Sequence, residues 1–414
     1  MGMGFGFLIG VQLARGLGAE GYGVYGLAMS IIALLTIPTE FGLPNLLTRE
    51  VAAAHAHGDA GRLHAVVRWA TRSVLGLSVI VSIVAIGWLL GTGRGLTTTI
   101  GLTVLAGMAM VPLVALGKLK GATLRGMQHL VKGQLPDGLV RPMAYSALLF
   151  LVPLWLMPLT PAIAMLAGTA AAAIAYLVAT RLLRSDIMAD PGFRGAGLDT
   201  RAWWGSALPM AMTEGVRGLQ GHATIIVMGA IAAEAMVGVF RVALSVSTFV
   251  ALPITLFMIV GSPVVSRLNA ENDKRRLQRL AGWLALGMSI GSLLLALPFF
   301  VVGDWLLSSV FGREFGAGNL PLAILCVGVV VYAALGPSAI LLNMTHHEQR
   351  VTKAFMVSVM VVVSTAIPLV KLYGAIGAAL ADVAGMLVGA IVMWRDASRL
   401  LDIDCSVWSL LRAR

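Results

Sequence analysis

Apolar stretches of about 20 residues recur along almost the whole chain, with short polar segments between them. A helix needs about 20 such residues to cross a bilayer core about 30 Å thick, because it rises about 1.5 Å per residue. Only 12% of the 414 residues are charged and 58% are hydrophobic, whereas about 25% are charged in a soluble protein. We therefore expect an all-α integral membrane protein, and the composition excludes a water-soluble enzyme.

The apolar stretches divide into about twelve transmembrane helices. The first stretch has only about 12 residues before Arg15 and reaches about 18 Å. We therefore expect a first helix that is short, or truncated by a missing or wrongly chosen start. The predicted spans lie near residues 3–14, 22–47, 70–90, 98–117, 140–157, 162–180, 203–230, 235–262, 280–302, 320–343, 354–370 and 374–394.

The positive charges alternate between the two sides of these spans. Of the 30 Lys and Arg residues, 24 follow even-numbered spans or lie in the C-terminal tail, counting Arg72 and Arg141 at the start of the next span, and four follow odd-numbered spans. Cytoplasmic loops carry such an excess. The distribution predicts that both termini are cytoplasmic. It also explains the net charge of +11 as a topology signal, so no nucleic-acid partner is expected.

The chain resembles itself after a shift of about 215 residues. Residues 23–25 (Gly-Val-Tyr) match residues 238–240 (Gly-Val-Phe), and Pro38 falls on Pro253. Because six spans separate the copies, both halves have the same orientation, and such repeats hold their substrate at the shared interface. The pattern predicts two six-helix lobes around a central cavity. Their bounds are 1–184 and 201–396, with a cytoplasmic linker at 185–200 and a cytoplasmic tail at 397–414.

Two segments carry a resemblance to a known family. Residues 13–52 (LARGLGAEGYGVYGLAMSIIALLTIPTEFGLPNLLTREVA) resemble the first helical hairpin of the polysaccharide, or O-antigen, flippases. Residues 368–393 (PLVKLYGAIGAALADVAGMLVGAIVM) resemble that family's last two helices, with a tight turn at Tyr373 and Gly374. The family belongs to the multidrug/oligosaccharidyl-lipid/polysaccharide exporter superfamily.

The resemblance implies a carrier in the bacterial cytoplasmic membrane that uses no cofactor. Such a carrier moves a polyprenyl-diphosphate-linked oligosaccharide from the inner to the outer leaflet by alternating access, for O-antigen, capsule or exopolysaccharide synthesis. Membrane lipids surround it, and a glycan polymerase is a candidate partner. The chain has no G-x-x-x-x-G-K-[ST] motif, so energy would come from a Na⁺ or H⁺ gradient or from downhill substrate flux.

Charged residues inside the spans are the candidate functional residues, since each costs about 2.5 kcal/mol or more in a bilayer. Glu214 and Arg217 are three residues apart near the middle of the seventh span and share a helix face. In the functional interpretation, Arg217 binds a phosphate or an acidic sugar of the substrate, and Glu214 is an ion-coupling site. The alternative is a self-neutralised structural pair.

Six further charged residues have one functional and one structural interpretation each. Arg241 either lines the outer mouth of the cavity or extends to the interface. Glu40 and Asp382 either couple transport to an ion or form hydrogen bonds to neighbouring helices. Three arginines at the inner ends of spans either bind the substrate or only reflect the usual excess of positive charge on the cytoplasmic side: Arg49, Arg125 and Arg141.

Two other functions compete with the flippase. A cation-coupled multidrug exporter of the same superfamily would favour acidic cavity residues, but basic residues are at least as frequent inside these spans. A membrane glycan polymerase or ligase would need a long outer loop with catalytic groups, and the longest one runs only from about residue 303 to 319. The two cysteines, Cys326 and Cys405, form no metal-binding cluster, so no metal site is expected.

Overall fold

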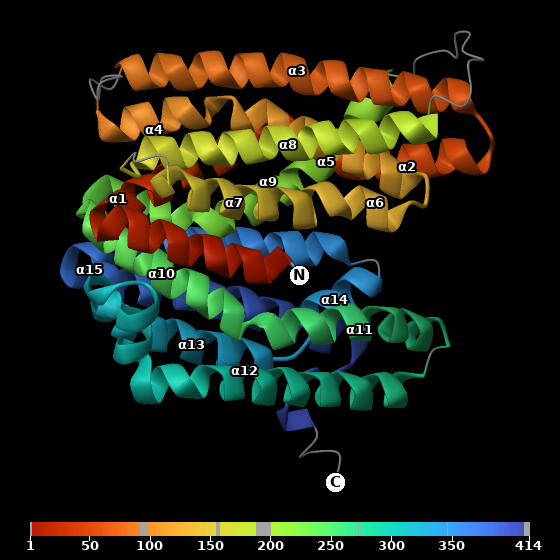
Figure 1. Cartoon of the computed structure of the whole chain (residues 1–414). Coiled ribbons are helices and arrows are strands. Elements are labelled where there is room, and N and C mark those ends of the chain that lie inside the picture. The colour runs from red at the N-terminus through yellow and green to blue at the C-terminus, as the bar shows by residue number, and fades with distance from the viewer. Residues whose placement is uncertain are drawn as a thin grey trace. The chain divides into compact units, whose positions relative to one another are not determined.

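The computed structural model describes residues 2–91, 98–154, 158–187, 200–271, 273–345 and 347–409. These residues form helices and contain no strand, as predicted (Figure 1). A helix satisfies its backbone hydrogen bonds internally, which is required of a segment in lipid. The helices are α1 (Gly2–Glu40), α2 (Leu43–Ala56), α3 (Ala60–Gly91), α4 (Thr99–Met108), α5 (Met110–Gly126), α6 (Leu130–Leu135), α7 (Arg141–Leu154), α8 (Pro161–Ile187), α9 (Thr200–Ile231), α10 (Glu234–Val250), α11 (Leu252–Ala270), α12 (Lys274–Val310), α13 (Asn319–Ala334), α14 (Ser338–Met344) and α15 (Glu348–Leu401), with a π-helical turn η1 (Pro136–Val140) and a 3₁₀ turn η2 (Arg313–Gly318).

The predicted spans fall on these helices in order, and two glycines divide the longest ones. Gly18 (φ 67°) interrupts α1 between the first two predicted spans, and Gly374 (φ 56°) interrupts α15 between the last two. Glycine adopts positive φ without a steric penalty. The turn predicted at Tyr373 and Gly374 is confirmed.

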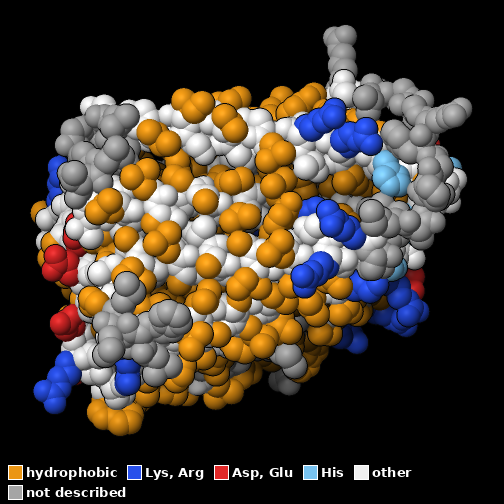
Figure 2. Space-filling view, turned by 45° about the horizontal axis from the view of Figure 1, so that its top comes forward, with side chains coloured by type: hydrophobic (Ala, Val, Ile, Leu, Met, Phe, Trp, Pro, Cys, Tyr) orange, Lys and Arg blue, Asp and Glu red, His pale blue; other side chains and the backbone are white. Residues whose placement is uncertain are grey.

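Nine helices in the described residues are long and apolar enough to cross a membrane, including two of 53 and 54 residues that contain these glycines. The second half of α3 exposes a row of large hydrophobic side chains at Val79, Ile80, Ile83 and Val84. Hydrophobic side chains also dominate the face shown in Figure 2, where Lys and Arg side chains gather mainly near the right edge.

The chain forms two compact units. The first contains residues 1–17 and 24–218, and the second contains residues 18–23 and 219–414. Residues 201–218, predicted to begin the second lobe, lie in the first unit, and the predicted lobe bounds stay a prediction. Most of the predicted linker, residues 188–199, lies outside the described residues.

The two units share one packing pattern. In the first, α5 packs against α8 and α2 packs against α3, and in the second, α13 packs against α15 and α11 packs against α12. A shift of about 215 residues places α5 near α13, α8 on the second half of α15, α2 on α11 and α3 on α12. The internal repeat predicted from the sequence is therefore visible in the helix contacts.

The end of the predicted tail packs on the second unit. Asp404 Oδ1 accepts hydrogen bonds from Trp394 Nε1 at 3.0 Å and from the Ser406 hydroxyl at 2.7 Å. A Cβ on Gly336 (φ 84°) would lie 1.7 Å from the Cys405 carbonyl oxygen. Ile403 and Cys405 are buried and belong to the hydrophobic core of this unit.

Candidate functional site

The corner between α1 and α2 positions the first group of predicted site residues. Phe41 (φ 42°) and Gly42 (φ 67°) turn the chain sharply, and Pro44 lies in the first turn of α2. A Cβ on Gly42 would lie 2.6 Å from the backbone nitrogen of Ala211 in α9. Glycine therefore allows the corner to touch the α9 backbone directly.

An aromatic cluster holds the start of α9 against the same corner. The ring centroid of Trp69 lies 5.1 Å from that of Trp203 and 5.2 Å from that of Trp204. The Phe41 ring meets the Trp204 ring edge-on at 5.4 Å. Such aromatic pairs contribute about 0.5–1.5 kcal/mol each beyond their buried area. The cluster fixes the register between α9 and the end of α1.

Glu40, at the end of α1, is neutralised within the membrane. Its Oε1 lies 2.7 Å from Lys118 Nζ on α5, with the Glu40 side chain 18% exposed. The charges of Asp137 and Glu214 also act on Glu40. The structure thus brings two of the predicted ion-coupling residues near one another, beside a lysine.

Glu214 does not pair with Arg217. The exposed Glu214 carboxylate instead accepts a hydrogen bond from Asn45 Nδ2 on α2 at 3.2 Å. Arg217 is also exposed, and no carboxylate among the described residues forms an ion pair with it. The self-neutralised pair considered from the sequence is therefore absent from the structure.

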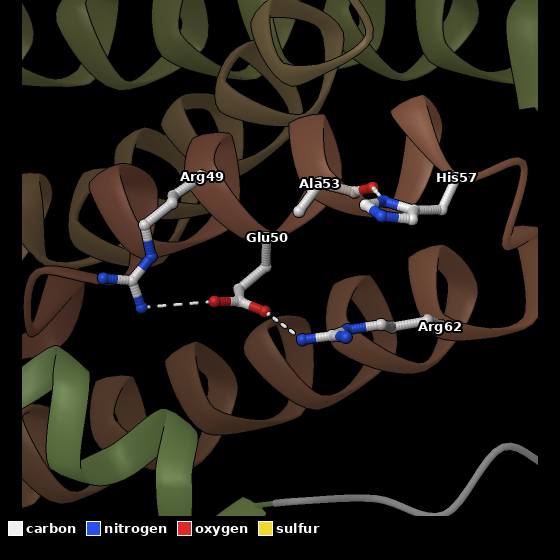
Figure 3. A network of polar contacts seen from close by, with 5 residues as sticks. All are labelled: Arg49, Glu50, Ala53, His57 and Arg62. Atoms are coloured by element: carbon white, nitrogen blue, oxygen red, sulfur yellow. Dashed lines mark hydrogen bonds and ion pairs between the residues drawn. The ribbon is translucent and has the colours of Figure 1, made fainter.

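Arg49 belongs to a charge network between α2 and α3 (Figure 3). Glu50 accepts from Arg49 Nη2 at 3.2 Å and from Arg62 Nη2 at 2.8 Å, and its side chain is only 11% exposed. His57 ends the same helix with a 2.8 Å contact from Nδ1 to the Ala53 carbonyl. Two guanidinium groups share one carboxylate, so one positive charge remains uncompensated within this network.

The other two predicted inner-end arginines lie on neighbouring elements of the first unit. Arg125, near the end of α5, donates from Nη1 to the Gly133 carbonyl of α6 at 3.4 Å, and the charge of Asp137 acts on it. Arg141 begins α7 directly after the π-helical turn and is half-buried. Arg125 therefore also has a structural role, at the contact between α5 and α6.

In the second unit, α9 meets α15 through polar contacts. The Thr224 hydroxyl donates to Asp382 Oδ1 at 2.8 Å, and Gln220 Nε2 donates to the Ser358 hydroxyl at 3.0 Å. No cation among the described residues forms an ion pair with Asp382. Asp382 is thus a membrane carboxyl without a positive partner, unlike Glu40.

Arg241 contacts an aromatic ring. Its guanidinium carbon lies 5.6 Å from the centroid of the Tyr22 ring, and its charge acts on His222. A cation over an aromatic face is attracted by the ring quadrupole. This geometry favours a half-buried position over extension to the interface.

Sequence reasoning missed the partners of the site residues. Lys118 was assigned to a loop, because the fourth span was ended at its first cation, but α5 continues to Gly126. Asn45 and Thr224 carry no charge, so nothing marked them. The sequence holds one signal that points to such a partner. Glu40 is a lone acid inside the second predicted span, and a carboxylate in that position needs a cation.

Comparison with known proteins decides the family. A model of the family described as "Polysaccharide biosynthesis protein" matches residues 1–269, more than half of the chain. The chain belongs to this family. The match confirms the resemblance carried by residues 13–52. A search of curated protein sequences found no significant match.

Solved transporter structures share the fold of this family member. One described as an inward-facing multidrug resistance MATE transporter of the MOP superfamily matches with a TM-score of 0.79 at 14% identity, over 100% of this chain and 94% of that one. The lipid II flippase MurJ in an inward closed conformation matches with 0.75 at 12% identity, over 99% and 89%. The Vibrio cholerae MATE transporter VcmN in its bent form matches with 0.59 at 15% identity, over 95% and 97%.

These findings give the chain the fold of multi-pass membrane transporters and flippases. They confirm the predicted family and fold class, and the solved structures that share this fold are transporters and flippases, not enzymes. The substrate, the coupling ion and the roles of individual residues stay predictions.

Proposed function

We propose that this chain flips a polyprenyl-diphosphate-linked oligosaccharide from the inner to the outer leaflet by alternating access. The pathway would make O-antigen, capsule or exopolysaccharide. Family membership supports a role in polysaccharide synthesis. The main observation in favour of an anionic substrate is the position of Arg217. Its guanidinium is exposed inside a predicted span and has no ion-pair partner among the described residues. A charge in such a position faces a water-filled cavity and is available to a diphosphate.

The inner-end arginines fit the entry of the same substrate. The network of Arg49, Arg62 and Glu50 keeps one uncompensated positive charge. Arg125 and Arg141 add two guanidinium groups in the first unit, and Arg241 adds one in the second. In this proposal these four predicted residues receive or release the diphosphate.

For ion coupling we favour Asp382 over Glu40 and Glu214. A carboxylate within the membrane needs a compensating charge, and Glu40 already has Lys118. Asp382 has only the Thr224 hydroxyl, so a proton or a Na⁺ ion would balance it. The proposal also places the chain in the bacterial cytoplasmic membrane with both termini in the cytoplasm, which C-terminal reporter fusions would test.

One observation favours the multidrug exporter instead. The exposed carboxylate of Glu214 has no cationic partner among the described residues and would suit a cationic drug. The two functions make opposite predictions for neighbouring residues of one helix: the flippase depends more on Arg217 and the drug exporter more on Glu214.

A deletion and complementation experiment separates them. Deleting the gene should cause lipid-linked oligosaccharide to accumulate on the cytoplasmic side, and wild type should clear it. Arg217→Ala should lower flipping about tenfold or more, the expected cost of losing a charged hydrogen bond. Arg279→Ala, an exposed arginine outside the predicted spans, is the matched control. Full activity of Arg217→Ala would contradict the cavity role, and drug sensitivity without a glycan defect would favour the exporter.

A further inference from the structure

A six-residue segment of α1 belongs to a different unit from the residues on both sides of it. Residues 18–23 are part of the second unit, although residues 1–17 and 24–218 form the first. The charge distribution places this segment on the outer side of the membrane. Three sets of contacts within the second unit hold it there.

The first contact is a carboxylate at a helix start. Gly18 (φ 67°) interrupts α1, and the helix continues from Ala19. The Ala19 N–H donates to Glu314 Oε2 at 2.8 Å. A negative charge at a helix N-terminus is favourable. Glu314 itself lies in η2 and is exposed.

The second contact is made by Tyr22. Its ring meets the ring of Phe315 edge-on, with centroids 6.2 Å apart. The guanidinium of Arg241 lies 5.6 Å from the Tyr22 ring centroid. Phe315 directly follows Glu314, so neighbouring residues of η2 hold both Ala19 and Tyr22.

The third contact joins two glycines that the internal repeat relates. A Cβ on Gly23 would lie 1.8 Å from the Glu234 carbonyl oxygen, and a Cβ on Gly238 would lie 2.0 Å from the Ala19 carbonyl oxygen. Each glycine therefore packs against the backbone four residues before its counterpart. Small residues permit such close helix contact in membranes.

We propose that residues 18–23 form a releasable latch on the second unit, with Glu314 as its principal acceptor. The flanking chain belongs to the first unit, so a movement of that unit in the proposed transport cycle would either detach the latch or strain the chain at Leu17 and Val24. This inference rests on the proposed transport cycle. The contacts suit repeated release because they consist of one exposed carboxylate, one ring cluster and one glycine crossing. Glu314 is a positioning residue in this proposal, since it acts on Ala19 and not on the substrate.

Labelling from outside the cell tests the latch without any substrate. Ala19 is 7% exposed and both native cysteines are fully buried, so an Ala19→Cys variant should react slowly with a membrane-impermeant maleimide. Adding Glu314→Ala should raise the labelling rate about threefold to fivefold, the change expected for losing one charged contact at a helix N-terminus. Glu314→Gln should give a smaller rise. Asp304→Asn, an outer carboxylate that does not contact Ala19, is the control. An unchanged rate in Glu314→Ala would overturn the proposal.

Cross-linking tests whether transport requires release. An Ala19→Cys/Glu314→Cys pair, joined by a short bis-methanethiosulfonate reagent, should lose transport and regain it in dithiothreitol. Each single variant and a Ser338→Cys variant are the controls. When copper phenanthroline oxidises the two thiols, the last should form a disulfide with native Cys405, whose Sγ lies 3.1 Å from the Ser338 Oγ, and this disulfide does not touch the latch. Normal transport by the cross-linked latch would overturn the proposal. If neither wild type nor any variant moves the glycan, the proposed substrate is refuted. The labelling result would still show whether Glu314 holds the latch.

Discussion

Lys118 Nζ lies 2.7 Å from Glu40 Oε1, which ties α5 to the last residue of α1. This ion pair stands directly before the Phe41–Gly42 corner, so it fixes the chain where α1, α2 and α9 meet. A carboxylate that loses its cation in such a place keeps the cost of desolvation. The pair is therefore both part of the fold and part of the candidate site.

Replacing Lys118 should destabilise the first unit. We expect Lys118→Met to cost about 1–3 kcal/mol. That is below the value for a fully buried pair, because the Lys118 side chain is 44% exposed. The double variant Glu40→Gln/Lys118→Met should cost less than the sum of the single variants. Thermal unfolding in detergent measures this. Arg267→Ala, which breaks the exposed pair with Glu271, is the control and should cost at most about 0.5 kcal/mol. Equal losses in Lys118→Met and Arg267→Ala would refute the expectation.

Neutralising Asp382 should remove the dependence of transport on an ion gradient. Asp382→Asn keeps the shape and the Thr224 contact but holds no proton or cation. Thr224→Val should have a milder effect, because it removes one hydrogen bond worth about 0.5–1.5 kcal/mol. Flipping in proteoliposomes under imposed Na⁺ and pH gradients is the measurement, with the surface variant Glu271→Gln as control. Undiminished gradient dependence in Asp382→Asn would return the coupling role to Glu40 or Glu214.

The fold was largely predictable because each span carries its own signal. About 20 apolar residues can only form a helix in lipid, and the Lys and Arg alternation fixes the order of the sides. The breaks at Gly18 and Gly374 followed from glycine within turn-like segments. The assignment of residues 18–23 to the second unit was not predictable, because it depends on contacts with Glu314 and Gly238, which lie far away in sequence.

The candidate site was predictable only in its charged members. A charge inside a span stands out in a sequence, so Glu40, Glu214 and Asp382 were found. Their partners are set by helix rotation and packing, which a single sequence does not specify. Thus Glu214 bonds to Asn45 on another helix and not to Arg217 one turn away, although the spacing of Glu214 and Arg217 predicts a shared helix face.

Alanine at Gly42 should be far more costly than alanine at Gly58. Gly42 and Gly58 have nearly the same φ, 67° and 65°. Alanine at either position is therefore held in the left-handed region, which costs about 1–2 kcal/mol of folding free energy. A Cβ at Gly42 would also overlap the α9 backbone at 2.6 Å, whereas nothing lies within 4 Å at Gly58. Gly42→Ala should therefore lose both stability and flipping, and Gly58→Ala should lose only a little stability. Equal melting temperatures for the two variants would show that the corner does not depend on this contact.

Stability should fall at alkaline pH through Cys405. Burial, with a smaller contribution from Asp404, raises the pKa of the Cys405 thiol to about 11, while the hydrogen bond with Ser338 opposes the rise. The thiol of the unfolded chain titrates near pH 8.5. The protonated thiol therefore contributes its full stability below about pH 8.5 and loses it as the pH rises towards 11, by at most about 3 kcal/mol. Melting temperatures at about pH 8 and about pH 10.5 should fall further apart in wild type than in Cys405→Ala, which lacks the titrating group. Other groups titrate in this range, so only the difference between the two proteins counts. Parallel pH profiles would show that the packed tail does not hold the thiol in its protonated form.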